Sequence, residues 1–245
     1  MLLRNAAPRM RERVAMKARR SWLTEADTAS ERLILDRLTE AFPHHAVLSE
    51  ESRPDTDWQH GYVWVVDPLD GTRNFAAGIP LYCVNLALAL DGEVLVGATY
   101  DPERDACVLG APGRGLTLAG EHVQSSSVSD LASAIVTADL GHPDAGGARM
   151  LALLGRLWPE VQGCRIVGSA ALGLSWAAAG LTDLMLHPTL YPWDIAAALA
   201  QVPAGGGVIL DGDGATARLD STSAVAGAPL AARELLERFG SSLRG

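Results

Sequence analysis

The 245-residue chain has few cysteines and no long apolar run, and both absences narrow what it can be. Its three cysteines are scattered and odd in number, so they indicate neither a disulfide framework nor a zinc site. We expect free, buried thiols in a reducing compartment, which favours a cytoplasmic location. No stretch reaches the 18 or more uncharged residues of a membrane-spanning helix, so no membrane partner is expected.

Positive charge is also scarce. The chain has 20 Lys and Arg residues against 29 Asp and Glu residues, for a net charge of −9. An acidic chain of this kind indicates no positively charged groove that could bind a phosphate backbone, so we expect no nucleic-acid partner. Basic residues gather only near the N-terminus, without the apolar core of a signal peptide, and we expect a basic amphipathic helix there. They are Arg4, Arg9, Arg11, Arg13, Lys17, Arg19 and Arg20.

Common catalytic and metal-binding patterns are missing too. None of the six histidines has a metal-ligand spacing to a second histidine or a cysteine, and no Ser-His or Cys-His arrangement suggests a covalent nucleophile. No internal repeat is visible. The composition, 48% hydrophobic and 20% charged, is that of a globular protein large enough for one domain or two lobes.

Carboxylates, by contrast, gather in three short segments. Asp67 follows the apolar run 62–66, which reads as a buried strand, and enters a Pro-Leu-Asp-Gly turn that contains Asp70. Two carboxylates about 4 Å apart repel by roughly 4 kcal/mol at an effective dielectric of about 20, and a divalent cation between them relieves this repulsion. Oxygen-only ligands suit Mg²⁺, Mn²⁺ or Ca²⁺ rather than zinc. The other two segments are 48–52, with Glu50, and 193–197, with Asp194.

In this order the three segments resemble the inositol monophosphatase family of Mg²⁺-dependent, lithium-sensitive phosphatases. The family pattern is a Glu-Glu pair, then Asp-Pro-(Ile/Leu)-Asp-Gly-Thr-x-Asn-Phe, then a distant Trp-Asp-x-Ala. The likeness continues at 23–27 and 167–171, and so covers roughly residues 14–239. It implies an α/β (α+β) fold, the five-layer αβαβα sandwich shared with fructose bisphosphatases, with the site between two lobes. Family members usually carry a longer first helix, which residues 1–13 do not resemble.

The pattern of apolar residues and turns predicts two lobes, 1–128 and 129–245, divided at the serine-rich stretch 125–129. In the first lobe we expect a helix that Thr24 caps and Pro43 ends. The expected strands of this lobe are 46–49, 62–66, 84–90, 94–100 and 106–109. In the second lobe we expect alternating strands and helices, typical of a layered α/β arrangement. Its strands are 134–138, 164–167, 184–186 and 207–210, and its helices are 147–157, 170–179 and 195–202.

The resemblance implies that two or three Mg²⁺ ions bind per site. Glu50 and the Leu69 carbonyl would bind the first ion, Asp67 would bridge two ions, and Asp70 and Asp194 would bind the second. Simpler interpretations exist for these residues. Asp67 and Asp70 could serve only the turn, Asp194 could only cap the helix that follows it, and Glu50 could lie at a solvated strand end.

Catalytic roles are also implied by the resemblance. Glu50 and a Thr72–Asp27 pair would orient the attacking water, although Thr72 could only cap a helix and Asp27 could only favour a helix dipole. Gly71 and Thr72 open a predicted helix, and backbone N–H groups at such a position suit a phosphate oxygen. Lys17, the only lysine, falls near a family lysine that lies close to the metal site, but it could be a surface residue.

Substrate contacts are expected from two parts of the chain. The residues are Asp70, Gly71, Thr72, Gly168, Ser169, Ala170 and His187. In inositol-preferring relatives an acidic residue occupies the position of His187, seven residues before Asp194. A histidine there offers different hydrogen bonds, so we expect weak or broad activity on inositol 1-phosphate. Alternatively, His187 only ends the strand 184–186.

The predicted reaction is therefore hydrolysis of a small sugar or polyol phosphate, such as inositol 1-phosphate, by a metal-activated water. The same site could serve histidinol phosphate, a 3′(2′),5′-bisphosphate nucleotide or fructose 1,6-bisphosphate. A non-enzymatic alternative is a metal-bound sugar-phosphate sensor, although an intact ligand set argues against it. The resemblance also implies a homodimer.

Overall fold

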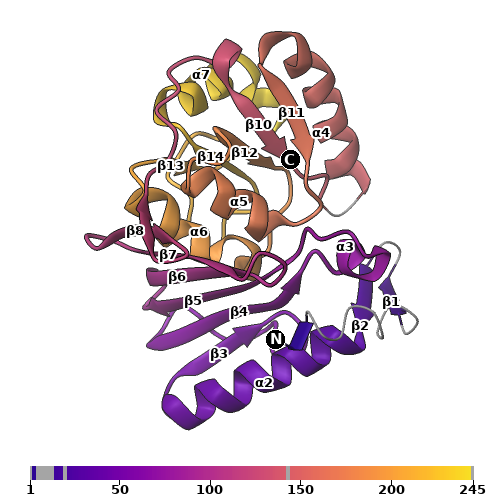
Figure 1. Ribbon diagram of the computed structural model, residues 1–245, viewed down its shortest axis with the longest axis vertical. Helices are drawn as coiled ribbons and strands as arrows, with labels where there is room; N and C mark the ends of the chain where they lie inside the picture. Colours follow the sequence, from indigo (N-terminus) through magenta and orange to yellow (C-terminus); the bar gives the residue numbers. More distant parts are fainter. Residues whose placement is uncertain (1, 4–13, 19–20, 142–143, 244–245) are drawn as a thin grey trace.

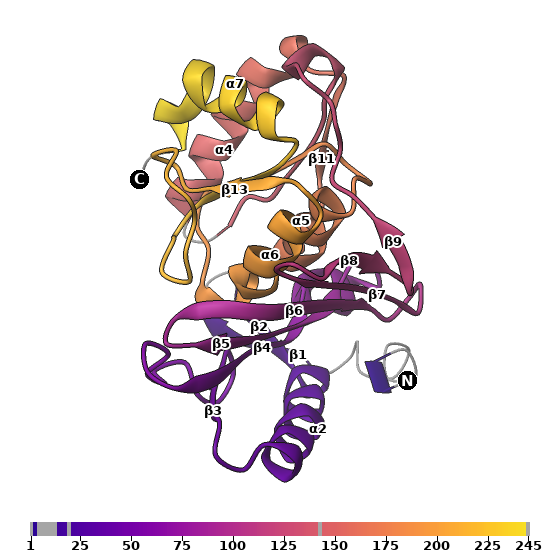
Figure 2. The same ribbon diagram turned by 90° about the vertical axis from the view of Figure 1, so that its left-hand side faces the viewer.

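A computed structural model describes residues 2–3, 14–18, 21–141 and 144–243. Two β-sheets alternate with three helical layers (Figures 1 and 2). Helix α2 covers the outer face of the first sheet, α5 and α6 lie between the sheets, and α4 and α7 cover the outer face of the second. The predicted αβαβα sandwich is confirmed. None of the described helices is long and apolar enough to cross a membrane.

The first sheet has seven strands in the order β3-β4-β5-β6-β7-β8-β9, parallel between β3 and β4 and antiparallel elsewhere. Its strands are β3 (Ala46–Ser49), β4 (Tyr62–Asp70), β5 (Cys83–Leu90), β6 (Glu93–Asp101), β7 (Ala106–Ala111), β8 (Gly115–Leu118) and β9 (Glu121–Val123). Before it come the hairpin β1 (Val14–Ala18) and β2 (Ser21–Thr24), then α2 (Glu25–Ala41). The short helix α3 (Thr72–Ala77) follows β4.

The second sheet has five strands in the order β11-β10-β12-β14-β13, and its first three are parallel. Its strands are β10 (Ile135–Ala138), β11 (Gly163–Ile166), β12 (Leu184–His187), β13 (Val208–Leu210) and β14 (Ala224–Gly227). Its helices are α4 (Asp144–Leu157), α5 (Ala170–Ala178), α6 (Pro192–Ala204) and α7 (Pro229–Phe239). Three-residue 3₁₀ turns lie at Leu131–Ser133, Trp158–Glu160 and Gly240–Ser242.

The expected elements are present, with three differences. Residues 14–18 form strand β1, so the expected basic helix is wrong there; residues 4–13 and 19–20 lie outside the described part. Strands β2, β8, β9 and β14 and helix α7 were not expected. The three cysteines are free, but Cys107 and Cys164 are only partly buried. The division into lobes at residue 128 stays a prediction; it falls in the connection between the two sheets, from Val123 to Ile135.

Helix α6 packs on both sheets, which matters because it carries Asp194. On one side Ala196 packs in a core cluster with residues of β4 and β5, and on the other Ile195 and Ala198 pack with residues of β12 and β14. Strand β6 approaches the helix closely. A Cβ atom on Gly97 would lie 2.3 Å from the carbonyl oxygen of Ala197, so only glycine fits this crossing.

Candidate metal centre

An irregularity in β4 turns Asp67 and Asp70 toward the same side. In the pairing with β5, Asp67 lies opposite Asn85 and Asp70 opposite Cys83, so three steps on β4 match two on β5. The extra residue is a bulge, and it changes the usual alternation of side chains. Without it, residues three apart on a strand would face opposite sides of the sheet.

Asp194 completes a cluster of three carboxylates. One oxygen from each of Asp67, Asp70 and Asp194 lies within 4.8 Å of the others. Asp194 lies in the first turn of α6, two residues after Pro192, the first residue of the helix. The N-cap is Tyr191, so the interpretation of Asp194 as the N-cap residue was wrong. Its carboxylate still serves the helix end, because it accepts a 2.8 Å hydrogen bond from the Tyr191 N–H.

The cluster is electrostatically costly. Burial raises the pKa of Asp67 well above its usual range, and the charges of Glu50 and the other two aspartates raise it further. Burial, and then the charge of Asp70, likewise raise the pKa of Asp194. Burial also raises the pKa of Asp70. A divalent cation would reverse this penalty, since it favours the ionised form of each carboxylate.

Glu50 lies just past β3, and its charge acts on both Asp67 and Asp194. Its loop is anchored from α2, because the buried Glu31 carboxylate accepts hydrogen bonds from the hydroxyl of Ser49 at 2.6 Å and the N–H of Ser52 at 3.0 Å. Glu31 on α2 thus holds the two serines that flank Glu50, Ser49 and Ser52, in place. Glu31 was not among the residues predicted from the sequence.

The same helix positions Thr72. The Thr72 hydroxyl lies 2.8 Å from Oδ1 of the fully buried Asp27 and 3.0 Å from the carbonyl oxygen of Leu69. On α2, the Ser30 hydroxyl donates to the Pro68 carbonyl at 2.8 Å. The structure therefore brings together the predicted pair Thr72 and Asp27, and it places the Leu69 carbonyl beside them.

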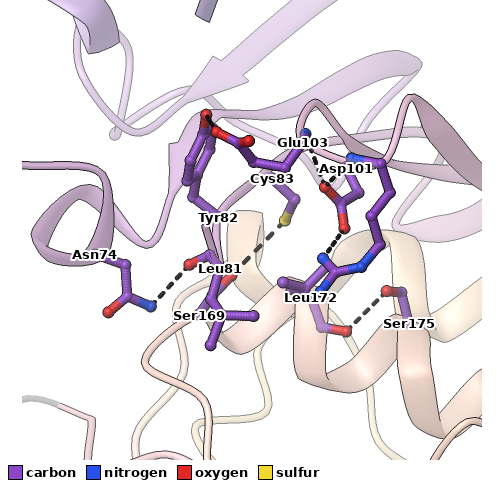
Figure 3. Close-up of polar contacts among 10 residues, drawn as sticks. Asn74, Leu81, Tyr82, Cys83, Asp101, Glu103, Ser169, Leu172 and Ser175 are labelled. Carbon is purple, nitrogen blue, oxygen red and sulfur yellow. Dashed lines mark hydrogen bonds and ion pairs between the residues drawn. The ribbon is translucent and has the colours of Figure 1, made fainter. Parts of the chain in front are cut away.

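Asp70 also joins the two sheets. Its carboxylate accepts hydrogen bonds from the N–H groups of Ala170 at 3.2 Å and Ala171 at 2.9 Å, at the start of α5, and from the Ser169 hydroxyl. Cys83 packs against the same contact, with its sulfur 3.6 Å from Asp70 Oδ2. The same sulfur lies 3.9 Å from the Ser169 oxygen (Figure 3). Ser169 and Ala170 thus lie in the site, but the structure shows them holding Asp70.

Asn74 and Gly71 shape the loops around this contact. The Asn74 side-chain amide donates to the Leu81 carbonyl at 2.7 Å (Figure 3). It also donates to the Val167 carbonyl at 2.8 Å and lies 3.2 Å from that of Gly168. Gly71 has φ +88°, and a Cβ atom there would lie 2.9 Å from the Leu81 carbonyl oxygen. Only glycine fits at position 71, because any other residue would be strained at this positive φ and its Cβ atom would clash with the Leu81 carbonyl.

Comparison with known proteins shows the family of this chain. The sequence profile of the inositol monophosphatase family matches residues 2–244. The chain belongs to the inositol monophosphatase family. It is 33% identical over 234 residues to an inositol monophosphatase of Dictyostelium discoideum, which covers 94% of this chain and 86% of that protein. It is 32% identical over 225 residues to the Nus factor SuhB of Escherichia coli K12, covering 91% and 84%.

The fold agrees with solved structures of this family. An IMPase from Thermotoga maritima superposes with a TM-score of 0.90 at 27% identity, over 99% of this chain and 92% of that one. As a member of a phosphatase family, the protein is a phosphoric monoester hydrolase. The carboxylate cluster is its candidate metal centre: the donor set is all oxygen and strongly acidic, as hard divalent cations require.

Two site features remain from the sequence analysis. His187 is buried at the end of β12, one residue beyond the expected strand, and its Nδ1 lies 3.3 Å from the Thr189 N–H. Lys17 lies in β1, and because its side chain is outside the described part, its predicted place near the metals stays a prediction. Asn85 was not predicted as a site residue, but its amide donates to the Trp193 carbonyl at 2.8 Å and so fixes the start of α6.

Proposed function

We propose that this phosphatase hydrolyses a small sugar or polyol phosphate, such as inositol 1-phosphate, with Mg²⁺ as cofactor and water as nucleophile. One observation carries the proposal: Asp67, Asp70 and Asp194 converge from two elements that lie far apart in the sequence, and burial and the charge of nearby carboxylates raise the pKa of each. A fold that keeps such a repulsive cluster has a use for a cation there.

Five groups would hold the metal ions: the carboxylates of Glu50, Asp67, Asp70 and Asp194, and the Leu69 carbonyl. Bound Mg²⁺ would lower the pKa of a water and neutralise charge on the phosphoryl oxygens. The N–H groups of Gly71 and Thr72, at the start of α3, would bind a phosphate oxygen.

Thr72 would orient the water through its oxygen lone pairs. A hydroxyl has one proton to donate and two lone pairs to accept with. When Asp27 receives that proton, over the observed 2.8 Å contact, the Thr72 oxygen is turned into an acceptor for a proton of the attacking water. Asp27 is a positioning residue in this arrangement, since it acts through Thr72.

Replacing Thr72 by valine is expected to lower kcat by about 100-fold, because an isosteric methyl group cannot accept the water proton. Thr72→Ser is the matched control, since it keeps the hydroxyl and should retain most of the activity. KM should change little in either variant, because the backbone N–H of residue 72 is unaffected. Steady-state phosphate release measures both constants; equal activity in the valine and serine variants would remove Thr72 from the chemistry.

The proposed activity is tested by phosphate release from a panel of monoesters after EDTA treatment and again after Mg²⁺ is restored. We expect no turnover with EDTA and recovery with Mg²⁺. The panel should hold inositol 1-phosphate, histidinol phosphate, a 3′,5′-bisphosphate nucleotide and fructose 1,6-bisphosphate. Their kcat/KM values rank the alternative substrates, while metal-independent release, or no release from any ester, would contradict the proposal.

Other properties of the family extend to this chain as parts of the same proposal. They are a homodimer, two or three Mg²⁺ ions per site and lithium sensitivity. A cytoplasmic location and the absence of a nucleic-acid partner also belong to the proposal, and they rest on the cysteine content and the net charge. The relatives named Nus factor SuhB leave a further role open for this fold. The complete carboxylate cluster favours catalysis over a metal-bound sensor, because a former enzyme that only binds its ligand usually loses one of its metal ligands.

A further inference from the structure

A small apolar cluster includes Leu69, the residue whose carbonyl is a proposed metal ligand. Its buried members are Leu3, Ala26, Leu69, Phe75 and Tyr82, and each has at most 5% of its surface exposed. Four of them belong to α2, β4, α3 and the segment just before β5. Leu3 comes instead from the start of the chain, and residues 4–13, between it and β1, lie outside the described part. The start of the chain therefore takes part in the packing around a proposed metal ligand.

The other members of the cluster are neighbours of site residues in the sequence, so their positions are tied to the site. Ala26 precedes Asp27, Leu69 precedes Asp70, Phe75 follows Asn74, and Tyr82 precedes Cys83. Leu69 has the most direct ties. Its N–H donates a 3.0 Å hydrogen bond to Asp67 Oδ1, and its carbonyl oxygen lies 3.0 Å from the Thr72 hydroxyl. A shift of Leu69 would therefore disturb Asp67, Thr72 and a carbonyl ligand together.

Other members of the cluster are anchored by contacts of their own. The rings of Phe75 and Tyr82 meet edge to face, with centroids 5.1 Å apart and planes at 89°. The Tyr82 hydroxyl also donates to the Glu103 carboxylate at 2.5 Å (Figure 3). Ala26 belongs to the 17-residue helix α2. Leu69, beside the bulge of β4, is thus the member that gives way most easily when the packing around it changes.

Removing most of the Leu3 side chain would leave a gap in this cluster. Neighbouring groups close such a gap only in part, and they move as they do so. The consequence for a bound cation depends on the cation, because Mg²⁺ requires near-ideal octahedral geometry with short bonds to oxygen, whereas Ca²⁺ accepts flexible arrangements. A displaced carbonyl ligand therefore weakens the binding of Mg²⁺ more than the binding of Ca²⁺.

We propose that Leu3 is a positioning residue of the metal centre: it fills the cluster around Leu69 and so sets where the Leu69 carbonyl and the Asp67 carboxylate meet the metal ions. This inference rests on the proposed Mg²⁺ centre and adds to it a dependence on the first residues of the chain. Leu3 contacts neither metal ion nor substrate in this arrangement. Its contribution lies in metal affinity and in the preference for Mg²⁺ over Ca²⁺.

A purely structural role for Leu3 makes a different prediction. If Leu3 only adds buried apolar surface, its loss should lower the melting temperature and leave metal affinity unchanged, as at other core positions. Leu153 on α4 provides that comparison, because it is fully buried in a separate core cluster of the second sheet. Leu2 provides a second comparison, because it is the neighbour of Leu3 and 37% of its surface is exposed.

The test titrates Mg²⁺ and Ca²⁺ into the whole metal-free protein by calorimetry, well below its melting temperature. In Leu3→Ala the apparent Kd for Mg²⁺ should rise about tenfold, the lower end of the loss expected when groups behind metal ligands are replaced. The apparent Kd for Ca²⁺ should rise less, so the ratio of the two Kd values changes. Leu2→Ala and Leu153→Ala should keep the wild-type Kd values for both ions, although Leu153→Ala should melt at a lower temperature.

Leu3→Val keeps a branched side chain and removes only one methylene group, so it decides the question if the alanine variant does not fold. It should raise the Kd for Mg²⁺ by a smaller factor than alanine does. An unchanged Kd for Mg²⁺ in the folded Leu3 variant would overturn the inference, and so would a rise of the same size in Leu153→Ala or for Ca²⁺. Failure of the underlying metal centre looks different, because the wild-type protein would then bind no Mg²⁺.

Discussion

Replacing Asp194 by asparagine is expected to lower kcat by about 10²- to 10³-fold while the fold remains intact. Asp194 belongs to the converging carboxylates, and a metal ligand there supplies several kcal/mol of transition-state charge stabilisation, at about 1.4 kcal/mol per tenfold in rate. Asparagine is nearly isosteric and keeps an oxygen to accept the Tyr191 N–H, so the start of α6 should persist. Phosphate release at saturating Mg²⁺ measures the loss.

A second aspartate allows a matched control. Asp130 accepts the Ser133 N–H at the start of a short 3₁₀ turn, away from the carboxylate cluster, so Asp130→Asn repeats the chemical change without touching the site. It should keep near wild-type activity. Full activity in Asp194→Asn would remove this residue from the metal centre, and an equal loss in both variants would indicate damage to the fold.

The sequence predicted the parts of the site that are encoded locally. A strand that runs into Asp-Pro-Leu-Asp-Gly-Thr predicted a turn and a helix start, and the structure has the helix start at Gly71 and α3. The strand itself continues to Asp70 through a bulge, which was not predicted. The segment around Asp194 was also recognisable, although the helix begins earlier than expected because Pro192 is accepted in its first turn.

Contacts across the fold could not be predicted in the same way. Asp70 on β4 contacts Ala171 on α5 only because α5 packs between the two sheets, and this packing does not follow from any local pattern. Glu31 likewise holds the Glu50 loop from another element, although Asp27, Ser30 and Glu31 share one face of a helix and could have been noticed by their spacing.

Two other omissions have local causes. Strand β14 consists of Ala224–Gly227, whose small residues give almost no strand signal, yet it is fully buried between β12 and β13. Helix α7 begins at Pro229, and its buried residues Ala231, Ala232, Leu235 and Phe239 follow helical spacing, so it could have been predicted.

The carboxylate cluster also sets how stability depends on pH and metal. The pKa values of Asp67, Asp70 and Asp194 are raised in the folded state above 3.8, their ordinary value. The folded protein therefore binds more protons than the unfolded chain, so the stability from these groups is present at low pH and is lost as the pH rises through the folded-state pKa values. Mg²⁺ replaces those protons, so its stabilising effect should grow with pH.

The size of the metal effect follows from linkage. A ligand that binds only the folded state at a hundredfold excess over its Kd adds about 2.7 kcal/mol. For a chain of this size that corresponds to a rise in Tm of about 5 to 10 °C. Asp194→Asn removes one of the repelling charges, so its metal-free form should be more stable than the metal-free wild type, and Mg²⁺ should add little to it.

The melting temperatures of wild type and Asp194→Asn, each with EDTA and with saturating Mg²⁺ at pH 6 and pH 8, test the metal centre most directly. The carboxylate cluster predicts a Mg²⁺-induced rise of several degrees in the wild type, larger at pH 8 than at pH 6, and little or no rise in the variant. Identical melting curves for the wild type with and without Mg²⁺, or the same rise in both proteins, would contradict a metal site built on Asp67, Asp70 and Asp194.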